Sequence, residues 1–504
     1  MVSIKQRYAK LEPTRQPYVD RAREAAKLTI PSLFPPEGAT GHTKLPTPYQ
    51  SVGSRGVNNL SSKLLLTLFP PNSPFFRFLI AKKLQMEEEV QTEIENALSK
   101  MESEVMDEIE TLALRPSMSE ALKQLIVAGN VLLFLEDSGL RVFHLDRYVV
   151  KRDGLGRPLE IIVKESVFPS TLDPEILAAC EVASSLVEKD ERLDLYTSIK
   201  RSSKNWAVSQ ELNDHIVPDS SGTYPLEECP WIALRFTKID GEDYGRGYVE
   251  EYLGDLVTME ELSKAIVQGS AAAAKVIFMV DPNGTVKVRT LAKAENLDVI
   301  QGNANEVSVL QLQKFADFRI ALETLDRAEK RLAHAFLLNS AIQRSGERVT
   351  AEEIRFLAGE LEDALGGTYS LFSRELQMTL IKALVAQMRK AKKLPTLPND
   401  TVKLAIITGI EALGRNHDLE KLRVFLEFLQ PLGPDVIQTY VNIDEYCTRV
   451  GTGLAINTKG LVKTTKEIQE AQQQDQMAQM MQQLGPTMFQ QLVEVQNPQA
   501  SSKA

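Results

Sequence analysis

Histidine and cysteine are the residue types in this sequence best suited to hold a metal ion or act as a nucleophile. The five histidines lie far apart, at positions 42, 144, 215, 334 and 417, and none belongs to an HExxH pair. A structural zinc site needs four such ligands held together, so we expect no metal. Cys180, Cys229 and Cys447 are equally dispersed and form no CxxC pair. This odd, sparse set indicates a reducing compartment and no disulfide framework.

Motifs for phosphoryl transfer, acyl transfer and calcium binding do not occur either. The chain has no GxxxxGK[ST] phosphate loop and no GxSxG nucleophile elbow. Gly241, Gly245 and Gly247 lack the spacing of a dinucleotide fingerprint. Asp281 begins a turn like that of a calcium loop, but Ala292 stands where a bidentate carboxylate is needed. We therefore expect no enzyme and no cofactor.

Length and composition are those of an ordinary folded protein, with either about three domains or one long multi-layer fold. The 504 residues are 43% hydrophobic and 25% charged, which is enough apolar material for a buried core. The 58 basic residues against 68 acidic ones give a net charge of −10, which disfavours a protein that coats DNA through its phosphates. The N-terminus lacks the apolar core of a signal peptide, and no apolar stretch approaches the ~20 residues that span a bilayer. We expect a soluble protein made in a cytoplasm, with no membrane contact.

Most of the negative charge comes from one segment. Ten acids and a single base, Lys100, lie between Glu87 and Glu110. Apolar residues recur among them at helical spacing, which predicts an amphipathic helix. Its acids indicate either a solvated face or a surface that repels polyanions or meets a basic partner.

Helical and strand-like patterns alternate along the chain. Helices are predicted over 17–28, 58–68 and 117–128, followed by a strand-rich region over 131–239 that only 174–189 interrupts with helical spacing. A long helix is predicted over Tyr248–Ala274, a small β insert over 276–310 and a second long helix over 311–338. Two long helices on either side of a β insert predict a stalk with a tip.

After the second long helix, the pattern breaks and then becomes helical again. Residues 339–349 are polar, and helical spacing resumes from Thr350 to about Ala391 with a pause at Gly366 and Gly367. Further helices are predicted over 402–413, 419–428 and 434–450. The segment 469–491 holds ten Gln and four Met, and is either a helix that orders only against copies of itself or a frayed tail.

Several long strings in the sequence match one family. They are PYQSVGSRGVNNL at 48–60 with its continuation through 63–70 and 74–77, GEDYGRGYVEEYLGDL at 241–256, and NSAIQRSGERVTAEEI at 339–354 with its continuation to Gln377. On these strings the chain resembles the portal, or head-to-tail connector, proteins of short-tailed double-stranded-DNA bacteriophages. The resemblance spans about Tyr8 to Asp418, and the region after about Leu419 departs from the family pattern.

The resemblance implies an α+β, mainly helical portal fold assembled as a ring, usually of twelve subunits. Its parts would be a wing (1–240), a first stem helix (241–275), a clip (276–310), a second stem helix (311–338), a tunnel loop (339–350), a wing helix (351–395), a helical crown (396–470) and a Gln/Met-rich tail (471–504). The independent prediction of helix, β insert and helix agrees with stem, clip and stem.

Charge along the stem suits a conduit that must not grip DNA, because every phosphate contact adds counterion-release free energy and a ring multiplies each residue. Residues 248–275 carry five acids against two lysines, so such a wall would repel the duplex. The predicted channel-wall acids are Glu250, Asp255 and Glu260. The predicted docking residues of the clip, for motor and adaptor, are Asn283, Lys287 and Arg289.

The tunnel loop has the opposite character. The residues predicted to form its channel contacts are Asn339, Gln343, Arg344, Glu347, Arg348 and Arg355. Besides simple exposure to solvent, two roles are open for the arginines. Either some of them form basic rings that touch phosphates and act as a valve, or they pair with Glu347, Glu352 and Glu353 within or between subunits.

The predicted function is that of a DNA conduit at the capsid vertex, used in genome packaging, retention, tail attachment and ejection. The partners implied are further copies of the chain, double-stranded DNA bound transiently, the terminase large subunit, a tail adaptor or tail tube protein, and the major capsid and scaffolding proteins, with internal core proteins as a further option. The location implied is the virion. The alternative is a virion component other than a portal, such as a tail adaptor or minor capsid protein, which would not require the long helical stalk.

Overall fold

The computed structural model describes most of the chain, which divides into two compact units. One unit comprises residues 1–85 and 100–409, and the other comprises 86–99 and 410–504. The described residues are 3–71, 74–80, 88–273, 277–295, 298–310, 315–338, 351–395, 402–406, 414–433, 441, 443, 446–447 and 450–451. Helices and strands both occur among them, which confirms the predicted mixture of helix and sheet.

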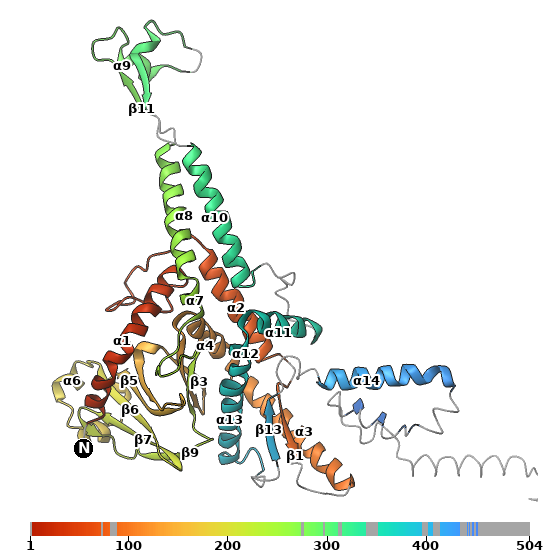
Figure 1. The fold of residues 1–504 in the computed structure, drawn as a ribbon. Helices are drawn as coiled ribbons and strands as arrows, with labels where there is room; N and C mark the ends of the chain where they lie inside the picture. Colours follow the sequence, from red (N-terminus) through yellow and green to blue (C-terminus); the bar gives the residue numbers. More distant parts are fainter. Residues whose placement is uncertain are drawn as a thin grey trace, which may run out of the picture. The chain divides into compact units, whose positions relative to one another are not determined.

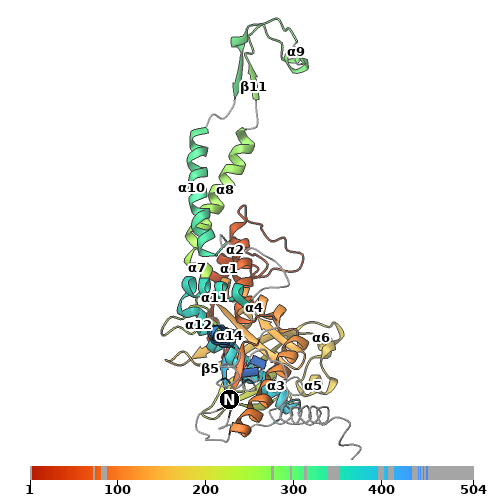
Figure 2. The same cartoon turned by 90° about the vertical axis from the view of Figure 1, so that its right-hand side faces the viewer.

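The largest sheet lies in the first unit and contains six strands (Figures 1 and 2). Its antiparallel neighbours are, in order, β4 (Tyr148–Arg152), β5 (Pro158–Val167), β6 (Leu193–Arg201), β7 (Asn205–Leu212) and β8 (His215–Ile216), with β9 (Gly222–Pro225) also paired to β7. Two short helices, α5 (Pro174–Ala179) and α6 (Ser184–Glu188), interrupt the strands where helical spacing predicts an interruption.

Helix α1 (Ile4–Leu28) covers one part of this sheet and is longer than the helix predicted over 17–28. Pro13 and Pro17 lie inside it, and proline normally ends or kinks a helix. Tertiary contacts hold the first turns in place, because Ile4 and Tyr8 pack against Val149, Ile162 and Tyr196 of the sheet. Packing of an apolar face thus outweighs the local preference of the prolines.

The first turn of α1 is also held by charge. The buried Glu211 of β7 accepts hydrogen bonds from the backbone N–H of Ile4 at 2.6 Å and of Lys5 at 3.0 Å. A carboxylate at this end satisfies N–H groups that have no partner within the helix and complements its dipole. About three turns further on, the buried Arg15 donates to the carbonyl oxygens of Asp146 and Tyr148.

A second, three-stranded sheet has the order β10–β2–β3, formed by β10 (Trp231–Arg235), β2 (Asn130–Glu136) and β3 (Gly139–Phe143). The ring of Phe134 stacks on that of Trp231 with centroids 3.9 Å apart. Helix α4 (Leu114–Ala128) leads directly into β2 and packs against β2 and β3. The predicted strand-rich region over 131–239 is therefore confirmed, and its strands form two sheets.

Helix α3 (Glu88–Thr111) confirms the helix predicted from the acidic segment. One of its acids does not lie on a solvated face: Glu102 is 4% exposed, and its carboxylate accepts a hydrogen bond from the N–H of Phe78 at 2.9 Å. Phe78 belongs to β1 (Phe76–Ile80).

Strand β1 pairs antiparallel with β13 (Val402–Ile406), with Phe78 opposite Leu404. The helix predicted over 402–413 is therefore wrong for 402–406. Apolar Val402, Leu404 and Ile406 alternate with Lys403 and Ala405, which is the period of a strand, and β1 supplies the partner that the local sequence could not reveal.

The long helix pair occupies the stretch predicted for it. A break at Tyr252 divides the first predicted helix into α7 (Tyr248–Glu251) and α8 (Leu253–Ala273), and the second helix, α10, runs over Phe315–Ala335. α8 and α10 lie side by side in both ribbon views. Between them in sequence lie β11 (Ile277–Val280), α9 (Val288–Lys293) and β12 (Val307–Leu310), of which β11 and β12 pair antiparallel.

The helical stretch after residue 350 is divided into pieces. They are α11 (Ala351–Leu365), α12 (Gly367–Phe372), a π-helical turn (Ser373–Gln377) and α13 (Met378–Lys390). The predicted pause is confirmed at Gly366, whose φ of +53° favours glycine. At the π-helical turn, the buried Gln377 donates its side-chain amide to the carbonyl oxygen of Leu68 at the end of α2 (Val52–Leu68).

In the second unit, α14 (Gly414–Leu429) contains the helix predicted over 419–428. The helix predicted over 434–450 falls mainly outside the described residues, and the Gln/Met-rich segment 469–491 falls wholly outside them. The predicted tunnel loop over 339–350 lies outside them as well.

We predict that Glu102→Gln stabilises the protein at pH 8 and not at pH 4.5. Burial raises the pKa of Glu102 from 4.5 to about 7, against the opposing effects of the Phe78 N–H and the Arg77 charge. The native state therefore binds more protons than the unfolded state between these values, so stability falls as the pH rises through this window. Glutamine keeps an acceptor oxygen without the buried charge, and the gain at pH 8 should approach ~3 kcal/mol.

The measurement is the free energy of unfolding in urea at both pH values. Glu110→Gln removes the same charge from an exposed position of α3 and serves as the control, with an expected change within ~0.5 kcal/mol. A difference between Glu102→Gln and the parent that is the same at pH 4.5 and pH 8 would contradict the assignment.

Candidate functional site: the helix pair and its junction

An ion pair joins the start of α8 to the last turns of α10. Arg331 of α10 donates from Nη2 to Asp255 Oδ1 of α8 at 2.6 Å and from Nε to Oδ2 at 3.2 Å. This two-bonded geometry fixes the register of the helices, and the carboxylate raises the pKa of Arg331. Leu256 and Met259 of α8 are buried, as are Ala328 and Leu332 of α10. An apolar seam beside the ion pair therefore supports it.

At the base of the pair an aromatic cluster surrounds the end of α10. The Phe336 ring lies 5.7 Å from Tyr248 and 5.8 Å from Tyr252, measured between centroids. Tyr248 also donates its hydroxyl to the carbonyl oxygen of Ala335 at 2.9 Å, and burial raises the pKa of Tyr248. Phe236 connects this cluster to Phe372 of α12. The aromatic side chains thus tie the end of α10 to α7, β10 and α12.

Helix α2 provides the surface on which Phe336 sits. A Cβ atom added to Gly56 would lie 2.6 Å from the Cγ atom of Phe336, so only glycine allows this close approach. One turn later, Asn59 donates from Nδ2 to the carbonyl oxygens of Phe336 and Leu337, both at 2.9 Å. Asn59 therefore caps the end of α10 from outside the helix.

Lys63, one turn beyond Asn59, links α10 to α11. Its ammonium donates to the Leu337 carbonyl oxygen at 3.1 Å and forms an ion pair with Glu360 at 3.1 Å. The residue is 5% exposed, and a buried ammonium is tolerated only when it is paired and hydrogen-bonded. Leu337 precedes the predicted tunnel loop and α11 follows it, so one lysine is bonded to both flanks of that segment.

Residues within 241–256 form a loop that packs against Asn130 and the end of α4. The Asn130 side chain donates to the carbonyl oxygen of Gly245 at 2.8 Å and accepts from the Gly245 N–H at 2.7 Å. A Cβ atom on Gly247 would lie 2.4 Å from the carbonyl oxygen of Val127, so the loop passes directly against the end of α4. We refer to the contacts of α2, α7, α10 and this loop as the junction.

Each predicted channel-wall acid has a partner within the chain. Glu250 accepts from Arg246 at 2.9 Å, and its carboxylate lies 3.5 Å from Arg21. Asp255 is bonded to Arg331, as described. Glu260 accepts from the backbone N–H of Tyr49 at 2.9 Å and thereby holds the segment that enters α2. Their predicted role as a repulsive wall stays a prediction, and the structure adds that all three also stabilise the subunit.

The structure does not describe most of the residues predicted for the tunnel loop. Asn339, Gln343, Arg344, Glu347 and Arg348 lie outside the described residues. Arg355 belongs to α11, within the described backbone. The structure therefore leaves open whether the arginines touch DNA or pair with neighbouring acids.

The predicted clip residues lie in the β11–β12 insert. Asn283 is in the turn after β11, where its N–H donates to Asp281 Oδ1 at 2.9 Å. Lys287 immediately precedes α9, and Arg289 is on α9, where it lines a shallow hollow of about 460 Å³ with Lys293 and Asp298. Arg289 therefore lines the hollow, whereas Asn283 does not.

Large apolar side chains on the same insert were not identified from the sequence. Phe278 is 60% exposed and Val299 is fully exposed, and both Met279 and Val288 are exposed as well. Their apolar type was visible in the sequence, but only the fold shows that this small two-stranded unit cannot cover them. Asn59, Lys63 and Arg331 were missed for a similar reason, because their partners are distant in sequence.

No group of three or more potential metal ligands and no helix that could cross a membrane occurs among the described residues. A sequence model of the family of bacteriophage head-to-tail connecting proteins matches residues 2–462. The chain belongs to this connector family. It is 41% identical to the portal protein of Escherichia phage T7, with 92% of this chain and 88% of that protein covered.

Two further relatives of this connector are also portal proteins. That of Enterobacteria phage SP6 is 32% identical, over 84% of this chain and 82% of its own length, and that of Pseudomonas phage phiKMV is 30% identical, over 89% and 90%. In the neck of an empty gene transfer agent particle, one chain aligns with 74% of this connector and 86% of its own length, at 12% identity and a TM-score of 0.38. The family resemblance found in the sequence is confirmed, and the connector is a structural virion protein rather than an enzyme.

We predict that Lys63→Met destabilises the connector by about 3 kcal/mol. The substitution keeps a long side chain, but it removes the ammonium partner of Glu360 and one of the donors to the Leu337 carbonyl oxygen, which Asn59 also contacts. Lys330→Met is the matched control, since its ion pair with Asp326 is exposed and should contribute less than ~0.5 kcal/mol. The free energy of unfolding in urea measures both, and equal values for the two variants would show that the buried pair does not hold the junction.

Proposed function

We propose that this connector is the portal subunit of its phage, and that a ring of copies, by expectation twelve, forms the DNA conduit at the capsid vertex. The observation that carries the proposal is the match to portal proteins over most of both chains. The long helix pair with a small β insert supports it, because such an extended element has few uses in a compact virion protein and suits the wall of a channel.

Exposed apolar side chains support association between copies. On the helix pair, Val257 and Val267 of α8 are 40% and 53% exposed, and Ile320 and Leu322 of α10 are 66% and 52% exposed. Helices of a single soluble subunit normally turn such residues inward, whereas an exposed apolar face marks an interface. We propose that neighbouring subunits cover these residues.

The β insert supports the same arrangement. Among the described residues, β11 and β12 pair only with each other, so each has an outer edge without a strand partner. An isolated two-stranded ladder is only marginally stable in water, and an uncovered edge is a template for another strand. We propose that a neighbouring subunit covers these edges and the exposed Phe278 and Val288.

In the assembled ring the acids of α8 would repel DNA, and Arg344 and Arg348 would provide the contacts that retain it. The proposed partners are transient double-stranded DNA, the terminase large subunit and later a tail adaptor at the insert with Asn283, Lys287 and Arg289, and the capsid and scaffolding proteins around the rim. Internal core proteins remain a further proposed partner. These assignments rest on the portal family and on the charge pattern of the sequence.

We predict that the purified connector forms closed rings with a central hole and that Val267→Asp with Ile320→Asp disrupts them. Two buried carboxylates per subunit would leave uncompensated charges at every interface, so the fraction in rings should fall at least tenfold. Electron microscopy and mass photometry measure this fraction. Leu155→Asp places the same charge at a 79% exposed position on the β4–β5 turn and should leave the rings intact. A wild-type protein that stays monomeric under all assembly conditions would refute the ring.

We predict that Arg344→Gln with Arg348→Gln increases the loss of DNA from filled particles, because the ring would lose its phosphate contacts. The measurement is the fraction of particles that keep a full genome after a salt and temperature challenge. Arg327→Gln removes a charge from an exposed ion pair on α10 and serves as the control. Retention equal to that of the parent would favour pairing of these arginines with neighbouring glutamates.

A further inference from the structure

The β11–β12 insert has almost no core of its own. Among its side chains that the structure describes, Val286 alone is buried, and it packs against Gly302, where an added Cβ atom would lie 2.4 Å from Val286 Cγ2. Phe278 and Val288 are more than half exposed, and Val299 is fully exposed. A unit with so little buried apolar surface depends on partners to cover it.

The acids of this insert are bonded within it. Glu306 accepts the backbone N–H of Thr285 at 2.6 Å, and Asp298 accepts that of Glu295 at 2.7 Å. Asp281 does the same for the turn after β11. Three of the four acids between residues 277 and 310 therefore hold the backbone of the insert itself.

The bases of the insert have no such bonds. Lys287, Arg289 and Lys293 are exposed, and none of them forms an ion pair with an acid in the part of the chain that the structure describes. Arg289 and Lys293 are one helical turn apart on α9, and like charges at this spacing destabilise a helix. A carboxylate placed between the two cations would replace this repulsion with attraction.

The same two cations line the hollow of about 460 Å³ beside α9, hereafter the α9 hollow. Val299 and Ile300 give it an apolar side. Asp298 also lines it, but its carboxylate is already bonded to the Glu295 N–H. The volume lies within the range of specific binding sites. The α9 hollow therefore combines positive charge with uncovered apolar surface.

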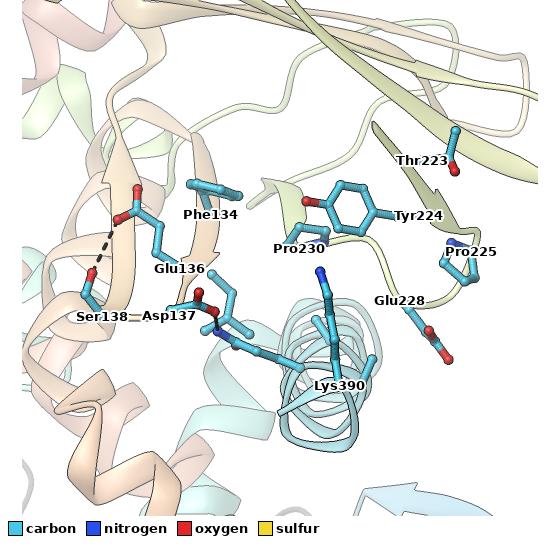
Figure 3. Close-up of a pocket in the computed structure, with 14 residues that line it drawn as sticks. Phe134, Glu136, Asp137, Ser138, Thr223, Tyr224, Pro225, Glu228, Pro230 and Lys390 are labelled. Carbon is cyan, nitrogen blue, oxygen red and sulfur yellow. Dashed lines mark hydrogen bonds between the residues drawn. The ribbon is translucent and has the colours of Figure 1, made fainter. Parts of the chain in front are cut away.

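A larger cavity, of about 760 Å³, lies between the second sheet and α13 and differs in this respect (Figure 3). Glu136 and Asp137 line it, but they accept from Arg141 and Gln387. The ammonium of Lys390 extends into the same space. These carboxylates are thus engaged within the chain, whereas the cations of the α9 hollow have no acid partner among the described residues.

We propose that the α9 hollow binds an acidic segment of a different protein that docks at the insert. A carboxylate of this segment lies between Arg289 and Lys293, and an apolar side chain next to it covers Val299 and Ile300. The proposal rests on the proposed function, which places motor and adaptor at the insert, and it adds the chemistry of recognition.

Charge complementarity decides for an acidic segment over a basic or purely apolar one. A second copy of the insert is a poor source of such a segment, because Asp281, Asp298 and Glu306 hold its own backbone. The occupant is therefore a different protein.

Fluorescence anisotropy with a labelled peptide tests the recognition on the full chain. The probe is a short peptide in which glutamate and leucine alternate, and its counterpart has glutamine in place of each glutamate. Because the chain has a net charge of −10, its overall field disfavours the glutamate peptide. We nevertheless expect the glutamate peptide to bind more tightly, and Arg289→Glu with Lys293→Glu to weaken its binding roughly tenfold or more. Lys10→Glu with Lys204→Glu reverses two exposed charges outside the insert and should leave binding unchanged.

Photo-cross-linking during particle assembly identifies the partner. Benzoylphenylalanine at Thr290, which lines the α9 hollow, should capture a segment of a different protein with an aspartate or glutamate beside the cross-linked residue. The yield should fall roughly fivefold or more when Arg289→Glu and Lys293→Glu are added. The same photoreactive residue at Leu155, which is exposed on the β4–β5 turn, gives the background.

Capture of a second copy of this chain, or of a segment without an acid, would overturn the proposal. Peptide binding or a cross-linking yield that the two reversed charges leave unchanged would do the same. Electron microscopy of the charge-reversed variant shows whether it folds and assembles. Intact rings with unchanged cross-linking would refute the α9 hollow and leave the portal function standing, whereas a wild-type protein that forms no rings would refute the portal function itself.

Discussion

The contact between Gly56 and Phe336 is the constraint on which the rest of the structure depends. It brings α10 close enough to α2 for Asn59 to cap the end of α10 and for Lys63 to reach Glu360 of α11. The aromatic cluster of Tyr248 and Tyr252 then closes around the same ring. A larger residue at position 56 would push the end of α10 away from α2. All of these contacts would then be lost together, because each needs the short distance between the two helices that glycine permits.

The junction anchors the long helix pair to the remainder of the subunit. The Asp255–Arg331 ion pair fixes α8 against α10, and Glu260 holds the segment that enters α2. Charged side chains that the sequence suggested for a DNA-facing wall therefore also hold the subunit together. The two roles are compatible, since an acid bonded on one side still contributes negative potential to a channel. Contacts of Asn59 and the buried Lys63 connect the end of α10 to α2 and α11.

Local patterns in the sequence predicted the helices, the strand-rich region and the order of helix, insert and helix, because periodicity is set by which face of each element is buried. Prediction failed where distant residues decide. The start of α1 at Ile4 depends on Glu211 and on packing against the sheet, and β13 is a strand because β1 pairs with it. At the site, the strings at 48–60 and 241–256 carried the family resemblance but gave no sign of the bonds that their residues make at the junction. The roles of Lys63 and Arg331 were invisible for the same reason, since each joins segments that lie far apart in the chain.

Hydrogen exchange of the purified connector tests most directly whether the junction and the helix pair form one unit. Peptides covering 55–66 of α2 and 328–337 of α10 would be compared over time and with added denaturant. If the account is correct, both peptides are strongly protected and lose protection at the same denaturant concentration, because they open together. Rapid exchange at the end of α10 while α2 stays protected would contradict the account, since it would mean that the helix pair is not anchored by these contacts.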